Sequence, residues 1–136
     1  MKIFICCSKS FYGKIPPLQK ALQKLGHTIT LPNSFNNPAK ENEMREKGAK
    51  DHSKWKAKML REQERKIRAN GAILVLNFEK NGQPNYIGGA TFLEMFKAFE
   101  LQKKIFLYHP APEGILKDEI NGFAPTIINE NLKLLG

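Results

Sequence analysis

The sequence feature that most constrains the fold is a short apolar run at residues 72–76, Ala-Ile-Leu-Val-Leu, which ends at the polar Asn77. A run of this length without polar alternation is typical of a strand covered on both faces, as in a parallel sheet. A second run of the same character, residues 2–7, opens the chain. Strands of this kind require helices on both sides of their sheet, so the sequence predicts an α/β fold.

The segments between these strands supply the helices. Apolar residues recur at helical spacing over residues 15–25, and Gly26 is placed to end that helix. Similar patterns predict, in chain order, a strand at 27–31, a helix at 52–69, a helix from 91, a strand at 104–109, an edge strand at 126–128 and a terminal helical turn at 131–135. This order predicts one domain, residues 1–136, with a small doubly wound, Rossmann- or flavodoxin-like sheet, mostly parallel, and helices on both faces.

Residues 33–51 interrupt this order. They are polar, carry mixed charge and show no clean periodicity. We expect them to form a mobile excursion, with a helical turn or two after Pro38 at most.

The composition indicates one soluble globular domain, with 136 residues, 41% of them hydrophobic and 26% charged. No apolar run approaches the roughly 20 residues of a membrane span, and the opening run is too short for a secretory signal. Cys6 and Cys7, the only cysteines, are adjacent, so they cannot join distant segments and they lack metal-site spacing. We expect them on opposite faces of the first strand, in a cytoplasmic protein with reduced thiols.

The formal net charge of +9 raises the question of nucleic acid. Much of the excess lies in residues 54–68, and a basic stripe there could bind a phosphate backbone. The same stretch contains Glu62 and Glu64, and its only aromatic residue is Trp55. The pattern favours a solvated helix face over a nucleic-acid-binding surface.

The stretch from 81 to 106 contains the first candidate site. It passes turn residues and the pair Gly88-Gly89, and then enters a helical pattern that carries Thr91 and Glu94 near its start. Glycines let a ligand approach the backbone, and free amides in a first helical turn favour an anionic or electron-rich group. Thr-x-x-Glu before an apolar run also matches a capping box, in which both side chains bond to amides of the helix start. Two interpretations are therefore open, a ligand site and a helix cap.

The loop after the first strand, residues 8–14, is the second candidate, because ligands of α/β sheets bind beyond the carboxyl ends of the strands. It offers two hydroxyls, two lysines and a glycine beside a helix amino terminus, which suits a phosphate or a sugar hydroxyl. Its spacing matches neither the P-loop nor the dinucleotide fingerprint, and a plain solvated loop fits equally well. Cys7 at the end of the strand could be a reactive thiol, although simple burial is favoured.

Taken together, these segments resemble the nucleoside 2-deoxyribosyltransferase superfamily, which includes the 2'-deoxynucleoside 5'-phosphate N-hydrolases. The resemblance rests on the strands at 2–8 and 72–77, and on residues 88–95, Gly-Gly-Ala-Thr-Phe-Leu-Glu-Met, followed by Lys-Lys-Ile-Phe at 103–106. It spans most of the chain and leaves residues 33–51 and the tail poorly matched. Cytokinin-type phosphoribohydrolases share a related motif that is one residue longer.

The resemblance implies cleavage or transfer of the N-glycosidic bond of a (deoxy)nucleoside or its 5'-monophosphate, in a homo-oligomer, without metal or organic cofactor. In the family, the helix glutamate attacks C1' and releases the base, and a second base or water then resolves the glycosyl ester. By position this nucleophile is Glu94. The implied substrate-binding residues begin with Cys7 at the end of the first strand and with Ser8, Ser10 and Lys14 on the loop where family hydrolases hold a 5'-phosphate. The others are Tyr86, Gly88, Gly89 and Thr91, before and at the start of the glutamate helix.

The sequence departs from the family at two positions where transferases carry aspartates, here Asn77 and Gly88. By position Asn77 belongs to the catalytic group, but a neutral amide can bond a hydroxyl without acting as a general acid. The proton for the leaving base would have to come from elsewhere, such as Asp118, Glu119 or a neighbouring subunit. Two alternatives stay open: a catalytically silent nucleotide-binding module, and a nucleic-acid-associated protein that uses the basic helix.

Overall fold

The computed structural model describes residues 1–136 and contains a five-stranded sheet in which all neighbouring strands are parallel. The strands are β1 (Lys2–Cys6), β2 (Thr28–Thr30), β3 (Ala72–Val75), β4 (Lys104–Leu107) and β5 (Thr126–Ile127). Their spatial order, β2-β1-β3-β4-β5, reverses direction between β1 and β3. A reversal of this kind is the topological switch point beside which α/β proteins bind ligands. The predicted doubly wound α/β fold is confirmed.

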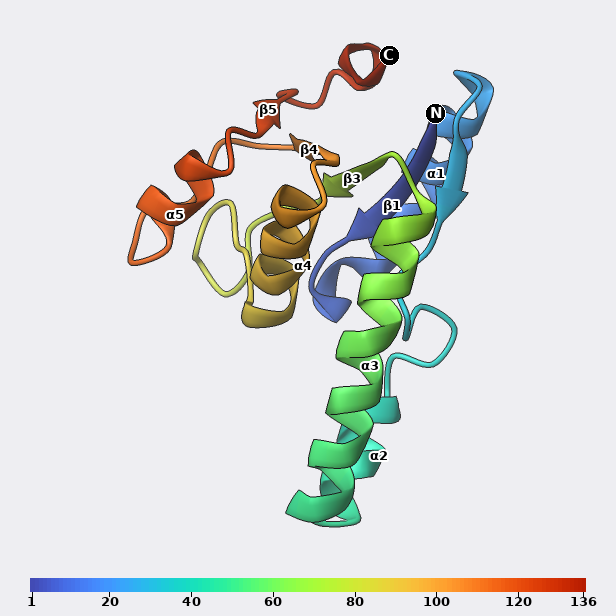
Figure 1. Ribbon diagram of the computed structural model, residues 1–136, viewed down its shortest axis with the longest axis vertical. Helices are drawn as coiled ribbons and strands as arrows, with labels where there is room; N and C mark the ends of the chain where they lie inside the picture. Colours follow the sequence, from blue (N-terminus) through green and yellow to red (C-terminus); the bar gives the residue numbers. More distant parts are fainter.

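Helices cover both faces of this sheet (Figure 1). In chain order they are η1 (Lys9–Lys14), α1 (Ile15–Lys24), α2 (Lys40–Glu46), α3 (Ala49–Ala69), α4 (Gly89–Glu100), α5 (Lys117–Gly122) and η2 (Leu132–Leu135). The side chains of α1 and η2 pack on one face, and those of α3, α4 and α5 pack on the other. None of these helices combines the length and the apolar character needed to cross a bilayer.

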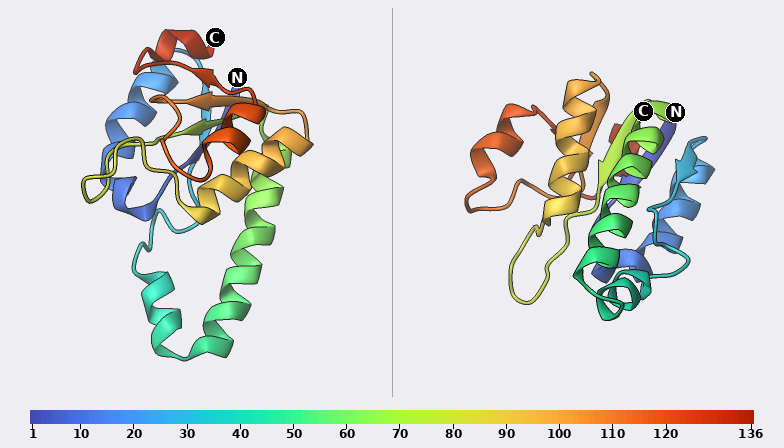
Figure 2. Two further views of the ribbon diagram at one scale, coloured as in Figure 1. Left: turned by 90° about the vertical axis from the view of Figure 1, so that its left-hand side faces the viewer. Right: turned by 60° about the horizontal axis from the view of Figure 1, so that its bottom comes forward.

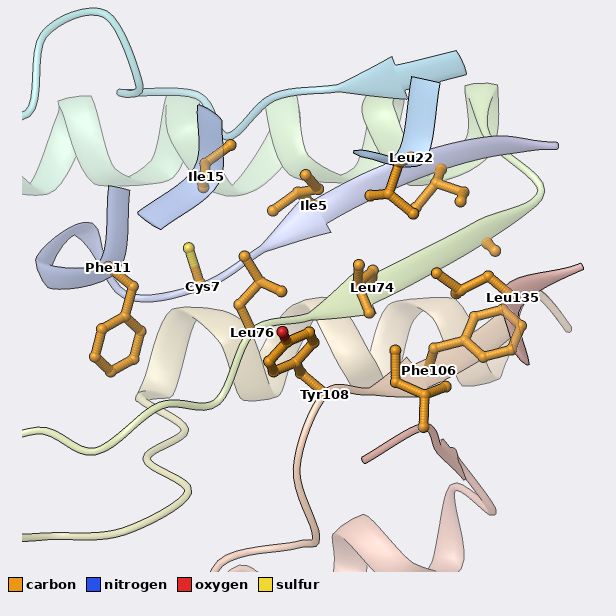
Figure 3. Close-up of a cluster of buried hydrophobic side chains, with 13 residues drawn as sticks. Ile5, Cys7, Phe11, Ile15, Leu22, Leu74, Leu76, Phe106, Tyr108 and Leu135 are labelled. Atoms are coloured by element: carbon orange, nitrogen blue, oxygen red, sulfur yellow. The ribbon is translucent and has the colours of Figure 1, made fainter. Parts of the chain in front are cut away.

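The core is divided by the sheet into two clusters, because successive side chains of a strand point to opposite faces. Cys7 joins the cluster that contains Leu22 of α1, and Figure 3 shows its thiol among Phe11 and other side chains of that face. Cys6 joins the opposite cluster with Met95 of α4. The expected placement of the two cysteines on opposite faces is confirmed. Each fully buried aliphatic side chain contributes about 1.5–3 kcal/mol, so both helical layers are held firmly to the sheet.

The excursion at residues 33–51 is more regular than the sequence indicates. It contains α2, and α3 begins at Ala49 instead of residue 52. The two helices form a hairpin that projects from the sheet (Figure 2). Gly48, with φ 117°, allows the sharp turn between them. The carboxylate of Glu41 on α2 also accepts a hydrogen bond from His52 Nε2 on α3 at 3.0 Å. This contact connects the two helices of the hairpin.

Two further segments differ from the sequence-based expectation. Residues 9–14, expected as a loop, form the 3-10 helix η1, capped by Ser8 Oγ, which accepts from the Ser10 amide at 3.3 Å. The tail contains the short helix α5 before its edge strand. The phenylalanine-rich helix α4 leaves Leu93, Phe96 and Phe99 partly exposed, and the expected homo-oligomer stays a prediction.

Asn77, just beyond β3, connects the carboxyl ends of two strands. Its side chain is fully buried, and Nδ2 donates to the carbonyl oxygens of His109 and Pro110 at 2.9 Å each. Oδ1 accepts from the amide of His109 at 2.9 Å. Both amide hydrogens are therefore engaged with the backbone that follows β4. An aspartate here would bring a carboxylate oxygen against two carbonyl oxygens, which explains the amide.

We therefore predict that both Asn77→Ala and Asn77→Asp lower the free energy of unfolding, by roughly 2–4 kcal/mol, since each leaves buried backbone groups without partners. Urea denaturation followed by circular dichroism measures the loss. Asn121→Ala, at an exposed asparagine of α5, is the matched control and should change stability by less than about 0.5 kcal/mol. An Asn77→Asp variant as stable as the wild type would contradict the assigned contacts.

Candidate active site

A cavity of about 430 Å³ lies at the carboxyl ends of β1 and β3, beside the switch point. Its walls come from three parts of the chain: the segment after β1, the segment that leads into α4, and the α2–α3 hairpin with the loop before it. Ligand pockets typically measure about 300–1,000 Å³, so this cavity has room for a molecule the size of a nucleotide. Figure 2 shows how the hairpin and the start of α4 approach this edge of the sheet from different sides.

Glu94 lies in the second turn of α4 and lines this cavity, although only 6% of the residue is exposed. Burial raises the pKa of its carboxyl from 4.5 to about 8, and the neighbouring Cys6 thiol and the ammonium groups of Lys66 and Lys56 offset part of that rise. With such a pKa, about one tenth of the molecules carry the carboxylate at pH 7. The ionised form is poorly solvated and therefore reactive.

The start of α4 decides between the two interpretations of Thr91 and Glu94. The N-cap is Gly88, no side chain caps the helix, and both Thr91 and Glu94 lie inside it. The capping-box interpretation is wrong for this chain. Gly88, Gly89 and Ala90 all line the cavity, so the uncapped first turn borders the space that a ligand would fill.

Gly88 lies close to the side chain of Tyr86. Its φ of −85° is open to any residue, but a Cβ atom there would lie 3.1 Å from the Tyr86 hydroxyl. Any side chain here, including the aspartate of the transferases that the sequence resembles, would require the tyrosine hydroxyl to shift by a few tenths of an ångström. Above the Tyr86 ring, Lys80 Nζ lies 4.7 Å from the centroid and 3.4 Å from Ser8 Oγ. Ser8, Lys80 and Tyr86 thus form one continuous wall.

The structure brings together most, but not all, of the residues implied by the sequence. Those that line the cavity are Cys7, Ser8, Tyr86, Gly88, Gly89, Thr91 and Glu94. Ser10, Lys14 and Asn77 do not line it. Ser10 is exposed on η1, the Lys14 ammonium lies 4.7 Å from the Phe78 ring centroid, and Asn77 is bonded to the backbone. The helical turn of η1 directs the first two away from the cavity.

Cys7 lines the cavity as a neutral thiol. Burial raises its pKa to about 12, and the nearby Glu94 carboxyl acts in the same direction. A thiolate nucleophile at this position is therefore disfavoured at neutral pH. The reactive role considered for Cys7 does not fit this environment, and its contribution to the cavity is one of shape.

The sequence interpretation missed the wall that the hairpin provides, together with several residues of the other two walls. The missed lining residues include Lys9, Tyr12, Asn33, Glu41, Arg45, Trp55, Lys56, Met59 and Lys80. Trp55 could have been singled out from the sequence, because it is the single aromatic residue in a basic helix. Its helix is far from β1 along the chain, so only the fold shows that it lies beside the end of β1. Together with Tyr12 and Tyr86, Trp55 supplies flat apolar surface on which a base can stack.

The cavity is positively charged. Lys9, Arg45, Lys56 and Lys80 line it, against the two carboxyl groups of Glu41 and Glu94. Burial acts to raise the pKa of Glu41, but its contacts with His52, Lys56 and Arg45 hold it below 4.5. Since Glu41 is engaged with these groups and Glu94 is mostly neutral at pH 7, the remaining cations favour an anionic ligand. The chain has no group of three or more His, Cys, Asp or Glu side chains placed to hold a metal ion.

Comparison with solved structures identifies a similar fold in an enzyme, the CMP N-glycosidase BcmB of Clostridium botulinum. The two chains share one fold. Their superposition has a TM-score of 0.56 and covers 99% of this chain and 97% of the other, with 16% sequence identity. No protein-family model matches the sequence, and no curated protein matches it.

We predict that Glu94→Gln stabilises the fold in a pH-dependent way. The folded-state pKa, about 8, is above the unfolded value of 4.5, so the wild type is at full stability below pH 4.5 and loses stability as the pH rises through 8. Glutamine cannot ionise and avoids this loss. The variant should therefore gain roughly 3–5 kcal/mol above pH 8 and little at pH 4.

Thermal and urea unfolding at several pH values measure this gain. Glu113→Gln is the control, because the Glu113 side chain is 84% exposed. It should differ little from the wild type at any pH. A gain for Glu94→Gln that is the same at pH 4 and pH 9 would show that the carboxyl is not buried as described.

Proposed function

We propose that the protein cleaves the N-glycosidic bond of a nucleoside 5'-monophosphate and that Glu94 is its nucleophile. The observation that carries this proposal is the buried Glu94 carboxyl on the wall of a positively charged, nucleotide-sized cavity at the switch point. The fold shared with an enzyme named as a CMP N-glycosidase supports the same reaction class and makes cytidine 5'-monophosphate the first substrate to test.

The phosphate would lie between the start of α4 and the segment after β1. The amides of Gly89 and Ala90 are free of a side-chain cap, and the ammonium of Lys80 lies beside Ser8 Oγ. These groups combine a helix amino terminus, a hydroxyl and a cation, which are the usual partners of a phosphate dianion. Tyr86 completes this wall, and Trp55 lies on the hairpin side where a base could stack.

In the first step, one carboxylate oxygen of Glu94 forms a bond to C1' as the bond from C1' to the base nitrogen breaks. The bonding electron pair leaves with the base, which takes up a proton from solvent, and the attacking water of the second step returns one proton to solvent. Water then attacks C1' of the glycosyl ester and frees the glutamate, so one water is consumed and the products are free base and sugar 5'-phosphate. This is the two-step chemistry of retaining glycosidases, in which a carboxylate stabilises an oxocarbenium-like centre before bonding to it.

The proton for the leaving base does not come from the carboxyl groups considered in the tail of the same chain. Asp118 and Glu119 lie on α5 and do not line the cavity. The phenolic hydroxyls of Tyr12 and Tyr86 do line it. Burial raises the pKa of Tyr12, so its hydroxyl stays protonated and can donate a hydrogen bond to the base as charge develops there.

A second candidate is a nucleotide-binding module without catalysis. It is favoured by one observation: Glu41, the other carboxylate in the cavity, is engaged with Arg45, His52 and Lys56 and is not free to act as an acid. This candidate predicts that nucleotides bind and raise the melting temperature while no base is released.

We predict release of free base from cytidine or deoxycytidine 5'-monophosphate, detected by liquid chromatography. Glu94→Gln should lower kcat by at least about a thousandfold, because the bond-forming oxygen is lost. Below pH 8 the value of kcat/KM should rise about tenfold per pH unit, and it should level off above pH 8, where Glu94 is ionised.

Glu100→Gln is the matched control, since Glu100 ends the same helix and its side chain is 49% exposed. It should keep wild-type activity. Nucleotides that raise the melting temperature without base release at any pH would contradict the enzyme and support the binding module. Base release that survives Glu94→Gln would contradict the assigned nucleophile.

A further inference from the structure

Asn33 carries an unusual polar atom. Its Oδ1 is buried and has no hydrogen-bond partner, and no other side-chain polar atom of the chain is in this state. Native structures leave few such atoms, because a buried acceptor without a donor is unfavourable. Asn33 lies shortly after β2 and lines the same cavity as Glu94. Asn33 therefore borders the space of the ligand, and a donor on that ligand could satisfy Oδ1 after a small local adjustment.

The orientation of the Asn33 amide is set by its other end. Nδ2 donates to the carbonyl oxygen of Met59 on α3 at 3.0 Å. If the amide were turned over, Oδ1 would face that carbonyl and two acceptors would oppose each other, so the hydrogen-bond network fixes the assignment. Asn33 therefore offers the ligand an acceptor and no donor.

The surroundings of Asn33 suit a flat heterocycle. Trp55 and Met59 both line the cavity, and they lie four residues apart on α3, which places them on one side of the helix. An indole ring and a thioether beside an amide oxygen provide a stacking surface with one polar position at its edge. The phosphate partners Ser8 and Lys80 belong to a different wall, formed by the segments after β1 and β3.

We infer that Asn33 determines the base specificity of this site: Oδ1 accepts a hydrogen bond from the exocyclic amino group of cytosine or adenine. The inference rests on the proposed nucleotide site and names the class of base. The exocyclic amino groups of cytosine and adenine project from the edge of the ring, and there they act only as hydrogen-bond donors. Uracil and guanine carry a keto oxygen at the equivalent position, which would oppose Oδ1 as acceptor against acceptor.

The contact with Asn33 Oδ1 allows an estimate of how much more tightly amino bases bind than keto bases. The oxygen is shielded from water in the unliganded chain, so a ligand amino group reaches it only after a small shift of the side chains around the Asn33 amide, and it then bonds without displacing a water. A keto oxygen in the same place leaves two buried acceptors unpaired. We expect amino bases to bind about 10- to 100-fold more tightly than their keto counterparts.

The test measures binding in a Glu94→Gln background, so that no turnover is needed. Isothermal titration calorimetry gives Kd for the size-matched pairs cytidine and uridine 5'-monophosphate, and adenosine and guanosine 5'-monophosphate. In at least one pair the amino base should bind about 10-fold or more tightly. Adding Asn33→Leu should bring the preference to within about threefold, mainly by weakening the amino base. Asn33→Ala is the second variant if leucine disturbs folding, and circular dichroism checks both.

Asn36→Leu, at an exposed asparagine of the same loop, is the matched control and should leave the preference unchanged. Equal binding within both pairs, tighter binding of the keto bases, or a preference that survives both Asn33 variants overturns the inference. Absence of binding for all four nucleotides overturns it together with the proposed site. A preference that depends on Asn33, with no base release by the wild type, supports this inference and contradicts only the reaction.

Discussion

Burial of the Glu94 carboxyl is the constraint around which the other features of this molecule are arranged. A carboxyl taken out of water is unfavourable in its charged form, and here the opposing groups, Lys66 and Lys56, offset only part of that effect. The helix that carries Glu94 is held in place by apolar packing, with Met95 in the core beside it. The stability of the layered sheet thus maintains a strained electrostatic state at its edge, which is common where a group is adapted for chemistry and not for folding.

The position of that group follows from topology. Because the strand order reverses between β1 and β3, the segments that leave these strands diverge and open a space that no helix fills. Asn77 holds the end of β3 to the backbone after β4, so the segment leading to α4 starts from a fixed point. On the opposite side, the α2–α3 hairpin extends past the sheet and, with the loop before it, closes the space with Trp55, Met59 and Asn33. A rigid sheet edge and a projecting hairpin together define the cavity.

The sequence was sufficient for the fold because the strong signals were local. The apolar run at residues 72–76 and the apolar stripe over 15–25 each specify an element without knowledge of the rest of the chain.

The residues of the candidate site were only partly predictable from the sequence. Glu94, Thr91 and Ser8 lie directly beyond strands or at a helix start, where chain order implies proximity, and they do line the cavity. Asn77 was assigned by position, but a side chain's hydrogen-bond partners depend on the distant segment it meets. The role of residues 33–51 was missed because α2 buries none of its residues, and its contacts with α3, such as the one between Glu41 and His52, join positions that the sequence pattern does not connect.

A direct titration of Glu94 tests the central claim most simply. Carbon-13 NMR of the glutamate side-chain carboxyls, with the resonance of Glu94 assigned by its absence in Glu94→Gln, follows the ionisation of this one group in the folded chain. The buried environment predicts a midpoint near pH 8. A midpoint near the ordinary value of 4.5 would show a solvated carboxylate and would contradict the assignment of this edge of the sheet as a site for glycosidic chemistry.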